Sequence, residues 1–209
     1  MGLFSRQESE DQVVNRLAKN AGNMVAMFKH TFTTPKGIDA TQALIFTASL
    51  AGHACRQAVI AEHGKFMEVT CDDGRKFYFG DDLNYYLLES QTSVVGFINA
   101  VTGIPVDTVK AIVRKFAESI WEEHFTVCGY DPKKLYEDVS QCWDGIFENM
   151  TSKYCKEPSE WPILFSIVVQ NILMMSLNAG APVNDAAKIA VECAVAVAKM
   201  SEKSFIYSG

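Results

Sequence analysis

The sequence lacks closely spaced cysteine pairs. No two of its six cysteines form a Cys-x-x-Cys or Cys-x4-Cys pair, and this spacing excludes zinc ribbons and thioredoxin-like redox sites. Several of the cysteines fall on apolar helical faces, where a free thiol acts as a small hydrophobic side chain. We therefore expect all six thiols to be reduced, which favours a cytoplasmic location. The six are Cys55, Cys71, Cys128, Cys142, Cys155 and Cys193.

The sequence also lacks an excess of positive charge. It has 19 basic against 25 acidic residues among 209, a net charge of −6. Non-specific binding to nucleic acid depends on clustered lysine and arginine, which release counterions from the phosphates. We therefore expect no nucleic-acid partner, and an acidic surface of this kind favours a basic protein partner instead.

Sequence motifs that are typical of common enzyme families are missing. The sequence has no phosphate-binding Gly-x4-Gly-Lys-Ser/Thr loop, no Gly-x-Gly-x-x-Gly after a strand, no Gly-x-Ser-x-Gly elbow and no His-Glu-x-x-His. We therefore predict no catalytic residues and no cofactor, and favour a protein that is not an enzyme.

Three residue pairs have a spacing that metal ligands can use. The two carboxylate pairs lack the Glu-x-x-His partner of helical di-metal sites, so we interpret them as solvated charged faces. The His/Cys pair lacks recognisable third and fourth zinc ligands, so we expect a histidine at a helix end and a buried thiol. No metal site is predicted. The pairs are Glu118 with Glu122, Asp144 with Glu148, and His124 with Cys128.

Charge is absent over one long apolar stretch, from Trp161 to Asn184. Its length approaches that of a membrane-spanning helix, but its interior contains polar side chains such as Gln170 and Asn171, and no Lys/Arg cluster flanks it. We interpret it as the core helix of a globular protein and expect no membrane insertion. Residues 1–7 have no apolar run of the kind found in secretory signals, and we expect a short flexible start to the chain.

Apolar residues recur at helical spacing almost everywhere else, and Pro/Gly breaks separate the segments. There is no internal repeat and no low-complexity linker, so we predict one domain, residues 1–209, with an all-α fold: a bundle of about seven helices and one β-hairpin. The last helix is rich in alanine, which permits close approach, and we expect it to pack against residues 163–177. The expected helices cover about 9–32, 39–62, 81–103 with a break at 90–93, 105–124, 131–154, 159–179 and 184–203.

The hairpin is predicted at about 65–80, where the apolar period changes. Two short β-rich runs flank Asp73 and Gly74, the preferred residues of a two-residue type I′ turn. That turn would place Asp72 opposite Arg75 and Val69 opposite Tyr78.

The hairpin is also the candidate partner surface. Three consecutive aromatic residues give each face of one strand more apolar area than a solvated hairpin normally shows, and a strand edge can pair with another chain. Our first hypothesis is therefore a cytoplasmic, non-enzymatic interaction protein, of regulator, adaptor or inhibitor type, that binds a partner through the hairpin and the adjacent acidic helix faces, or a self-associating chain. Burial of the same aromatic residues in the core is the competing interpretation. The candidate residues are Arg75, Phe77, Tyr78 and Phe79.

A second hypothesis is a small-ligand-binding helical bundle or a helical enzyme, with a polar pocket between the two charge-poor helices. Polar side chains interrupt both helices, and buried polar groups need a partner, which a ligand can supply. The competing interpretation is that these groups hydrogen-bond each other or the backbone and fix helix packing. The candidates are His53, Arg56, Gln57, Gln170 and Asn171.

Overall fold

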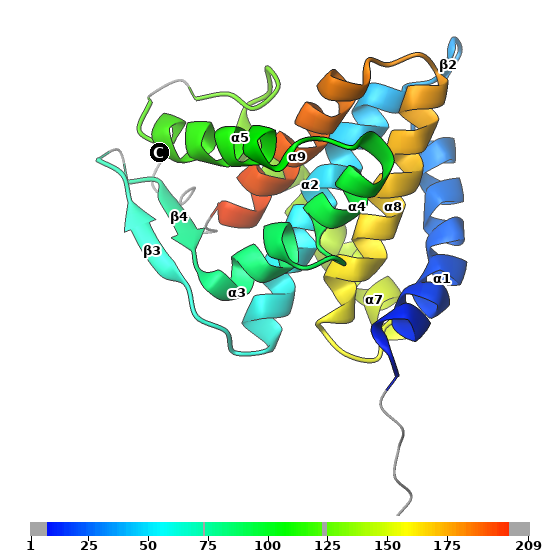
Figure 1. Ribbon diagram of the computed structural model, residues 1–209, viewed down its shortest axis with the longest axis horizontal. Coiled ribbons are helices and arrows are strands. Elements are labelled where there is room, and N and C mark those ends of the chain that lie inside the picture. Colours follow the sequence, from blue (N-terminus) through cyan, green and yellow to red (C-terminus); the bar gives the residue numbers. More distant parts are fainter. Residues whose placement is uncertain (1–7, 73, 123–124, 201–209) are drawn as a thin grey trace, which may run out of the picture.

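The computed structural model describes residues 8–72, 74–122 and 125–200 (Figure 1). It confirms an all-α fold with a small antiparallel hairpin. The start of the chain that we expected to be flexible, residues 1–7, lies outside the described residues.

Local capping signals set the first two helices. Helix α1 (Glu10–Thr31) begins with a capping box, in which Ser9 and Gln12 bond each other's backbone N–H. A pair of two-residue strands, β1 (Thr33–Thr34) and β2 (Gly37–Ile38), then leads into α2 (Ala40–Ala61). The Asp39 carboxylate accepts the Gln42 backbone N–H at 3.0 Å and caps α2.

The remaining helices follow the predicted order with three differences. Two segments contain π-helical turns, the helix predicted to reach residue 124 ends at Ser119, and the last helix ends at Lys199. His124, which we weighed as a metal ligand, lies outside the described residues. The elements are α3 (Asp81–Asn84), η1 (Tyr85–Glu89), α4 (Val94–Thr102), α5 (Val106–Ser119), α6 (Pro132–Cys142), η2 (Trp143–Phe147), α7 (Glu148–Tyr154), α8 (Glu160–Asn178) and α9 (Val183–Lys199).

Helix α2 forms the centre of the bundle and packs most extensively against α9 and α8 (Figure 1). The alanine-rich α9 does pack against α8, which contains residues 163–177, as expected, but its main partner is α2. The small residues do permit close approach there: a Cβ added to Gly52 would lie 2.1 Å from the Ala194 carbonyl oxygen. The absent side chain of Gly52 thus sets the distance between these two helices.

The hairpin consists of β3 (Met67–Thr70) and β4 (Lys76–Phe79). Its register differs by one residue from the prediction: Val69 faces Phe77 rather than Tyr78. The cause is a three-residue loop, since Cys71 rather than Asp72 pairs with Arg75 and Gly74 has φ +85°. In this register Val69 and Phe77 share one face of the hairpin, and Phe77 is buried whereas its neighbour Tyr78 is only partly buried.

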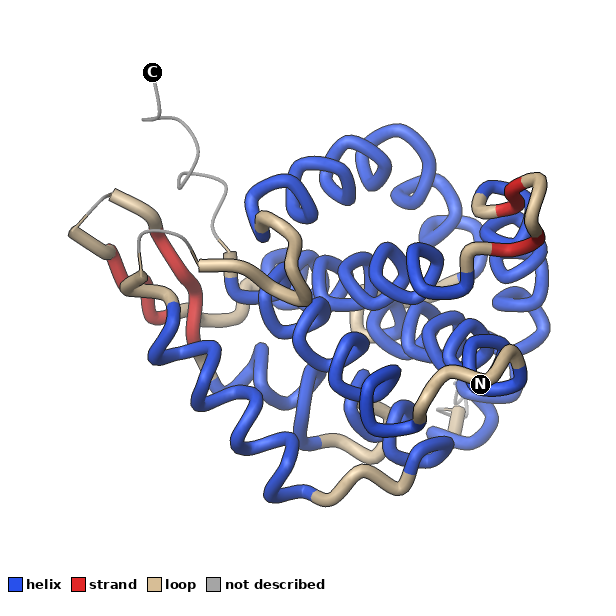
Figure 2. The backbone as a smooth tube through the Cα atoms, turned by 90° about the horizontal axis from the view of Figure 1, so that it is seen from above, coloured by secondary structure: helices blue, strands red, loops and turns tan. Residues whose placement is uncertain are grey.

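The hairpin lies at the opposite end of the bundle from β1 and β2 (Figure 2). Phe77 has no exposed surface and packs edge-on against Phe116 of α5. Its backbone also forms a β-bridge to Met200, directly after α9. The second edge of β4 is thereby covered at Phe77, and the hairpin is attached to the end of α9.

Two helices in the described part of the chain, α2 and α8, are long and apolar enough to cross a membrane by length and composition. Most of each apolar window is buried inside the fold, 83% for α2 and 61% for α8.

The close contact at Gly52 predicts opposite effects for two Gly→Ala substitutions. Gly52→Ala should lower the free energy of unfolding by about 3 kcal/mol, because its methyl group would meet rigid backbone of α9. Gly22→Ala, in exposed α1 with nothing near the added Cβ, should raise it by about 0.5–1 kcal/mol. Urea unfolding of both variants measures this, and equal effects would contradict the contact.

Candidate functional site

The structure does not assemble the polar pocket considered between the charge-poor helices. His53 and Arg56 of α2 are both buried, and the His53 ring packs against Tyr136 and Trp143. Gln57 lies one turn along, with its Nε2 3.1 Å from His53 Nε2. Burial, and secondarily the charge of Arg56, hold the pKa of His53 well below its usual range, so the ring is neutral at physiological pH.

The two candidates on α8 point elsewhere. The Gln170 amide donates to the Phe97 carbonyl of α4 at 3.4 Å, and Asn171 donates to the Ile167 carbonyl of its own helix at 2.8 Å. None of the four cavities described for residues 8–72, 74–122 and 125–200 is lined by these residues or by His53 and its neighbours. Gln57 bonds His53, and Gln170 and Asn171 bond backbone carbonyls, as the competing interpretation expects, whereas His53 Nδ1 is buried with no hydrogen-bond partner in the described part of the chain.

Arg56 joins three elements instead of lining a pocket. Its guanidinium donates to the Met200 carbonyl and, at 2.8 Å, to the Tyr136 hydroxyl of α6. The same group lies 5.0 Å from the centre of the Tyr136 ring. Arg56 therefore fixes the end of α9 against α2 and α6.

The four hairpin candidates lie in different environments: one in the core, two in contacts within the protein, and one at the wall of a cavity. Phe77 belongs to the core, and Tyr78 stacks on Phe66 with ring centres 4.9 Å apart. Arg75 donates to the Glu122 carbonyl at 2.8 Å, which ties the loop to the end of α5. Phe79 lines the largest of the four cavities, which we call the Lys199 cavity.

The Lys199 cavity has a volume of about 710 Å³ and lies between α5 and the elements η1 and α4, with the end of α9 behind it. Most of its wall is apolar. The apolar residues are Phe79, Leu88, Val95, Ile104, Val106, Val109, Val113 and Ala117, and the polar ones are Asn84, Glu89, Asn99, Lys110, Arg114 and Lys199.

Lys199 is the unusual member of this wall, because only 2% of its surface is exposed. Its Nζ donates to Asn84 Oδ1 at 3.1 Å and lies 4.7 Å from the centre of the Phe79 ring. Both partners are neutral, so they solvate the ammonium without neutralising it. Burial lowers the pKa of Lys199 to about 8, and the amine is still mostly protonated at neutral pH.

Sequence reasoning missed this site because its parts are far apart in the chain. Phe79 was singled out for its aromatic character, but Asn84 and Lys199 carried no signal of their own. The spacing of Val109 and Val113 on α5 marks an apolar stripe, and such a stripe does not show whether side chains or a cavity cover it.

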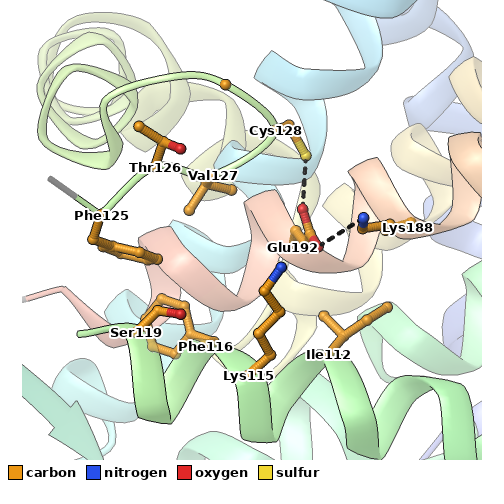
Figure 3. Close-up of a pocket in the computed structure, with 11 residues that line it drawn as sticks. Ile112, Lys115, Phe116, Ser119, Phe125, Thr126, Val127, Cys128, Lys188 and Glu192 are labelled. Carbon is orange, nitrogen blue, oxygen red and sulfur yellow. Dashed lines mark hydrogen bonds and ion pairs between the residues drawn. The ribbon is translucent and has the colours of Figure 1, made fainter. Parts of the chain in front are cut away.

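A second cavity, of about 250 Å³, lies on the other flank of α5, against α9 and the turn at residues 125–129 (Figure 3). The side chains of Cys128, Glu192, Lys188 and Lys115 line it. We call it the Cys128 cavity.

Within the described ranges, no group of three or more His, Cys, Asp or Glu side chains is arranged to hold a metal ion. The charged and reactive groups that line the two cavities are amine, guanidinium, thiol and carboxylate side chains.

The buried amine predicts a specific dependence of stability on pH. Between pH 8 and 10.5 the unfolded chain keeps the Lys199 proton while the folded chain releases it, so the free energy of unfolding rises with pH in this window. Lys199→Met has no such proton. The stability of the wild type relative to this variant should therefore rise by about 3 kcal/mol across the window, measured by urea unfolding at several pH values. A difference that does not change with pH would contradict the buried amine.

Comparisons of the chain with models of protein families, with curated proteins and with solved structures find no match.

Proposed function

We propose that this protein binds a small amphipathic carboxylate, a molecule with an apolar body and one carboxylate group, in the Lys199 cavity. The observation that supports this most directly is the Lys199 ammonium, which is buried at the wall of an apolar cavity, where it donates a hydrogen bond to the neutral Asn84 amide and lies over the Phe79 ring.

Burial of the Lys199 ammonium lowers the stability of the folded protein. A charged group taken out of water is destabilising unless a counter-charge and hydrogen bonds replace the lost hydration. A ligand carboxylate beside Nζ would supply both. Binding of the carboxylate would then offset part of the free energy that burial of the Lys199 ammonium costs the folded protein.

The charges around the cavity favour the same ligand. Lys110 and Arg114 of α5 add two positive groups to its lining, against one carboxylate from Glu89. This local excess of positive charge stands out in a chain whose net charge is −6. It would attract an anion and orient its charged end.

The apolar wall and the volume fit the rest of such a molecule. Ligand cavities are usually roughly 300–1,000 Å³ and mostly apolar, with a few polar groups that fix orientation. The Lys199 cavity, at about 710 Å³, falls within this range. A hydrocarbon body would cover the valine and leucine side chains that face the cavity.

Binding can be tested with two probes of the same chain length, decanoate and decanol, by calorimetry at pH 7. The wild type should bind decanoate roughly tenfold or more tightly than decanol, because a hydrogen-bonded charge pair forms only with the carboxylate. Lys199→Met should lose this preference and still bind decanol. Above pH 8 the preference of the wild type should also fall as Lys199 loses its proton.

Lys19→Met is the matched control, since Lys19 is exposed on α1 and lines none of the four cavities. It should leave both affinities unchanged. Binding of neither probe to the wild type, or an unchanged preference in Lys199→Met, would refute the proposal.

A protein partner at the hairpin is the second candidate function. In the described residues β3 pairs only with β4, so its other edge is open to an added strand, and Met67 on it is 63% exposed. A basic partner would suit the net charge of −6, whereas a second copy of the chain would have to pair along the β3 edge against the repulsion of like charges. Met67→Lys should weaken such binding in a pull-down and in light scattering while leaving decanoate affinity unchanged.

A further inference from the structure

The Cys128 cavity contains a thiol on a tight turn. Val127 and Tyr130 exchange two backbone hydrogen bonds, of 2.9 and 2.8 Å, around the two-residue turn Cys128–Gly129. Both turn residues have positive φ, +51° and +81°. Such a turn favours Asn and Gly, and a cysteine in the first position is held in a conformation that its side chain disfavours.

A carboxylate lies within hydrogen-bonding distance of this thiol. Cys128 Sγ donates to Glu192 Oε2 at 3.1 Å, and the other oxygen of Glu192 forms an ion pair with Lys188 Nζ at 3.7 Å (Figure 3). Glu192 and Lys188 are one turn apart on α9, so the helix fixes the carboxylate relative to the turn. Cys128, Glu192 and Lys188 thus lie next to one another in space as a nucleophile, a base and a group that orients the base.

The cavity in front of the thiol has two further features. Lys115 extends from α5 toward Glu192 and places a positive charge beside the reacting groups (Figure 3). Phe116 and Phe125 line the cavity with aromatic surface. The space of about 250 Å³ therefore suits a small acyl group whose carbonyl oxygen becomes negative during attack.

We propose that Cys128 is a nucleophile that accepts the acyl group of a small activated ester or thioester, with Glu192 as its general base. Cys128 Sγ attacks the acyl carbonyl carbon, and its proton passes to Glu192. The bond from carbon to the leaving oxygen or sulfur then breaks, and the leaving group departs with the bonding electron pair. Water hydrolyses the resulting thioester on Cys128 and releases the carboxylic acid.

The Cys128 thiol is protonated, so it needs the Glu192 carboxylate as a base. The neighbouring Cys193 thiol, burial and the Glu192 carboxylate all raise the pKa of Cys128, so it is a neutral thiol at physiological pH. A neutral thiol is a weak nucleophile and must lose its proton during the attack. Reactivity at this site should therefore depend on Glu192. The proposal is independent of carboxylate binding, because it concerns the opposite flank of α5.

The probe is p-nitrophenyl acetate at neutral pH, followed by release of nitrophenol and by peptide mass spectrometry. The wild type should release about one equivalent in a burst and carry one acetyl group on Cys128, as expected for covalent catalysis. Glu192→Gln should slow the burst roughly 100-fold, because it keeps the shape of the side chain and cannot accept the proton. Cys128→Ser should abolish the acetylated peptide.

Two controls separate a loss of chemistry from a loss of folding. Cys128→Gly suits the positive φ of the turn and should keep the circular dichroism of the wild type while giving no burst. Cys142→Ser, which removes a partly buried thiol on α6, should react like the wild type. A normal burst in Cys128→Gly, or an unchanged rate in Glu192→Gln, would overturn the proposal.

Discussion

The arrangement of this protein depends on the contact between Gly52 of α2 and the Ala194 backbone of α9, where no side chain separates the two helices. This contact brings the alanine-rich helix along the most buried one. Arg56, one turn beyond Gly52, then binds the Met200 carbonyl and fixes the position at which α9 ends. Through Met200 the same position determines where β4 pairs, so the hairpin is placed by an interaction in the centre of the bundle.

Helix α9 also connects the two cavities. It contributes Glu192 to one and Lys199 to the other, and α5 lies across it between them. Each cavity is therefore lined on one side by α9, which packs closely on α2, and on another side by α5, which packs chiefly on α9. Glu192 and Lys199 both lie on α9, so one helix fixes the positions of both groups.

The helices could be predicted well because the signals that start a helix act over a few residues: the capping box at Ser9, the Asp39 cap and the proline that opens α6 stand at the starts of the helices predicted from about 9, 39 and 131. The hairpin register could not be obtained in this way, because Asp73-Gly74 suits a two-residue and a three-residue loop equally. The function of His53 was also undetermined, since a polar group on an apolar helix has the same sequence pattern in a core and in a pocket. The Lys199 cavity is lined by residues of the hairpin, the bundle and the final helix. A local sequence pattern does not predict which distant segments will contact each other, so it could not predict this cavity.

The α2–α9 contact has a consequence for biosynthesis. Helix α2 is made before α9, since residues 40–61 precede residues 183–199, so the surface of α2 that α9 covers stays exposed in a nascent chain until α9 emerges from the ribosome. Contacts between segments so distant in sequence also slow folding, because a large loop must close before they form. The apolar surface of α2 that α9 covers is therefore exposed to aggregation for as long as α9 is missing.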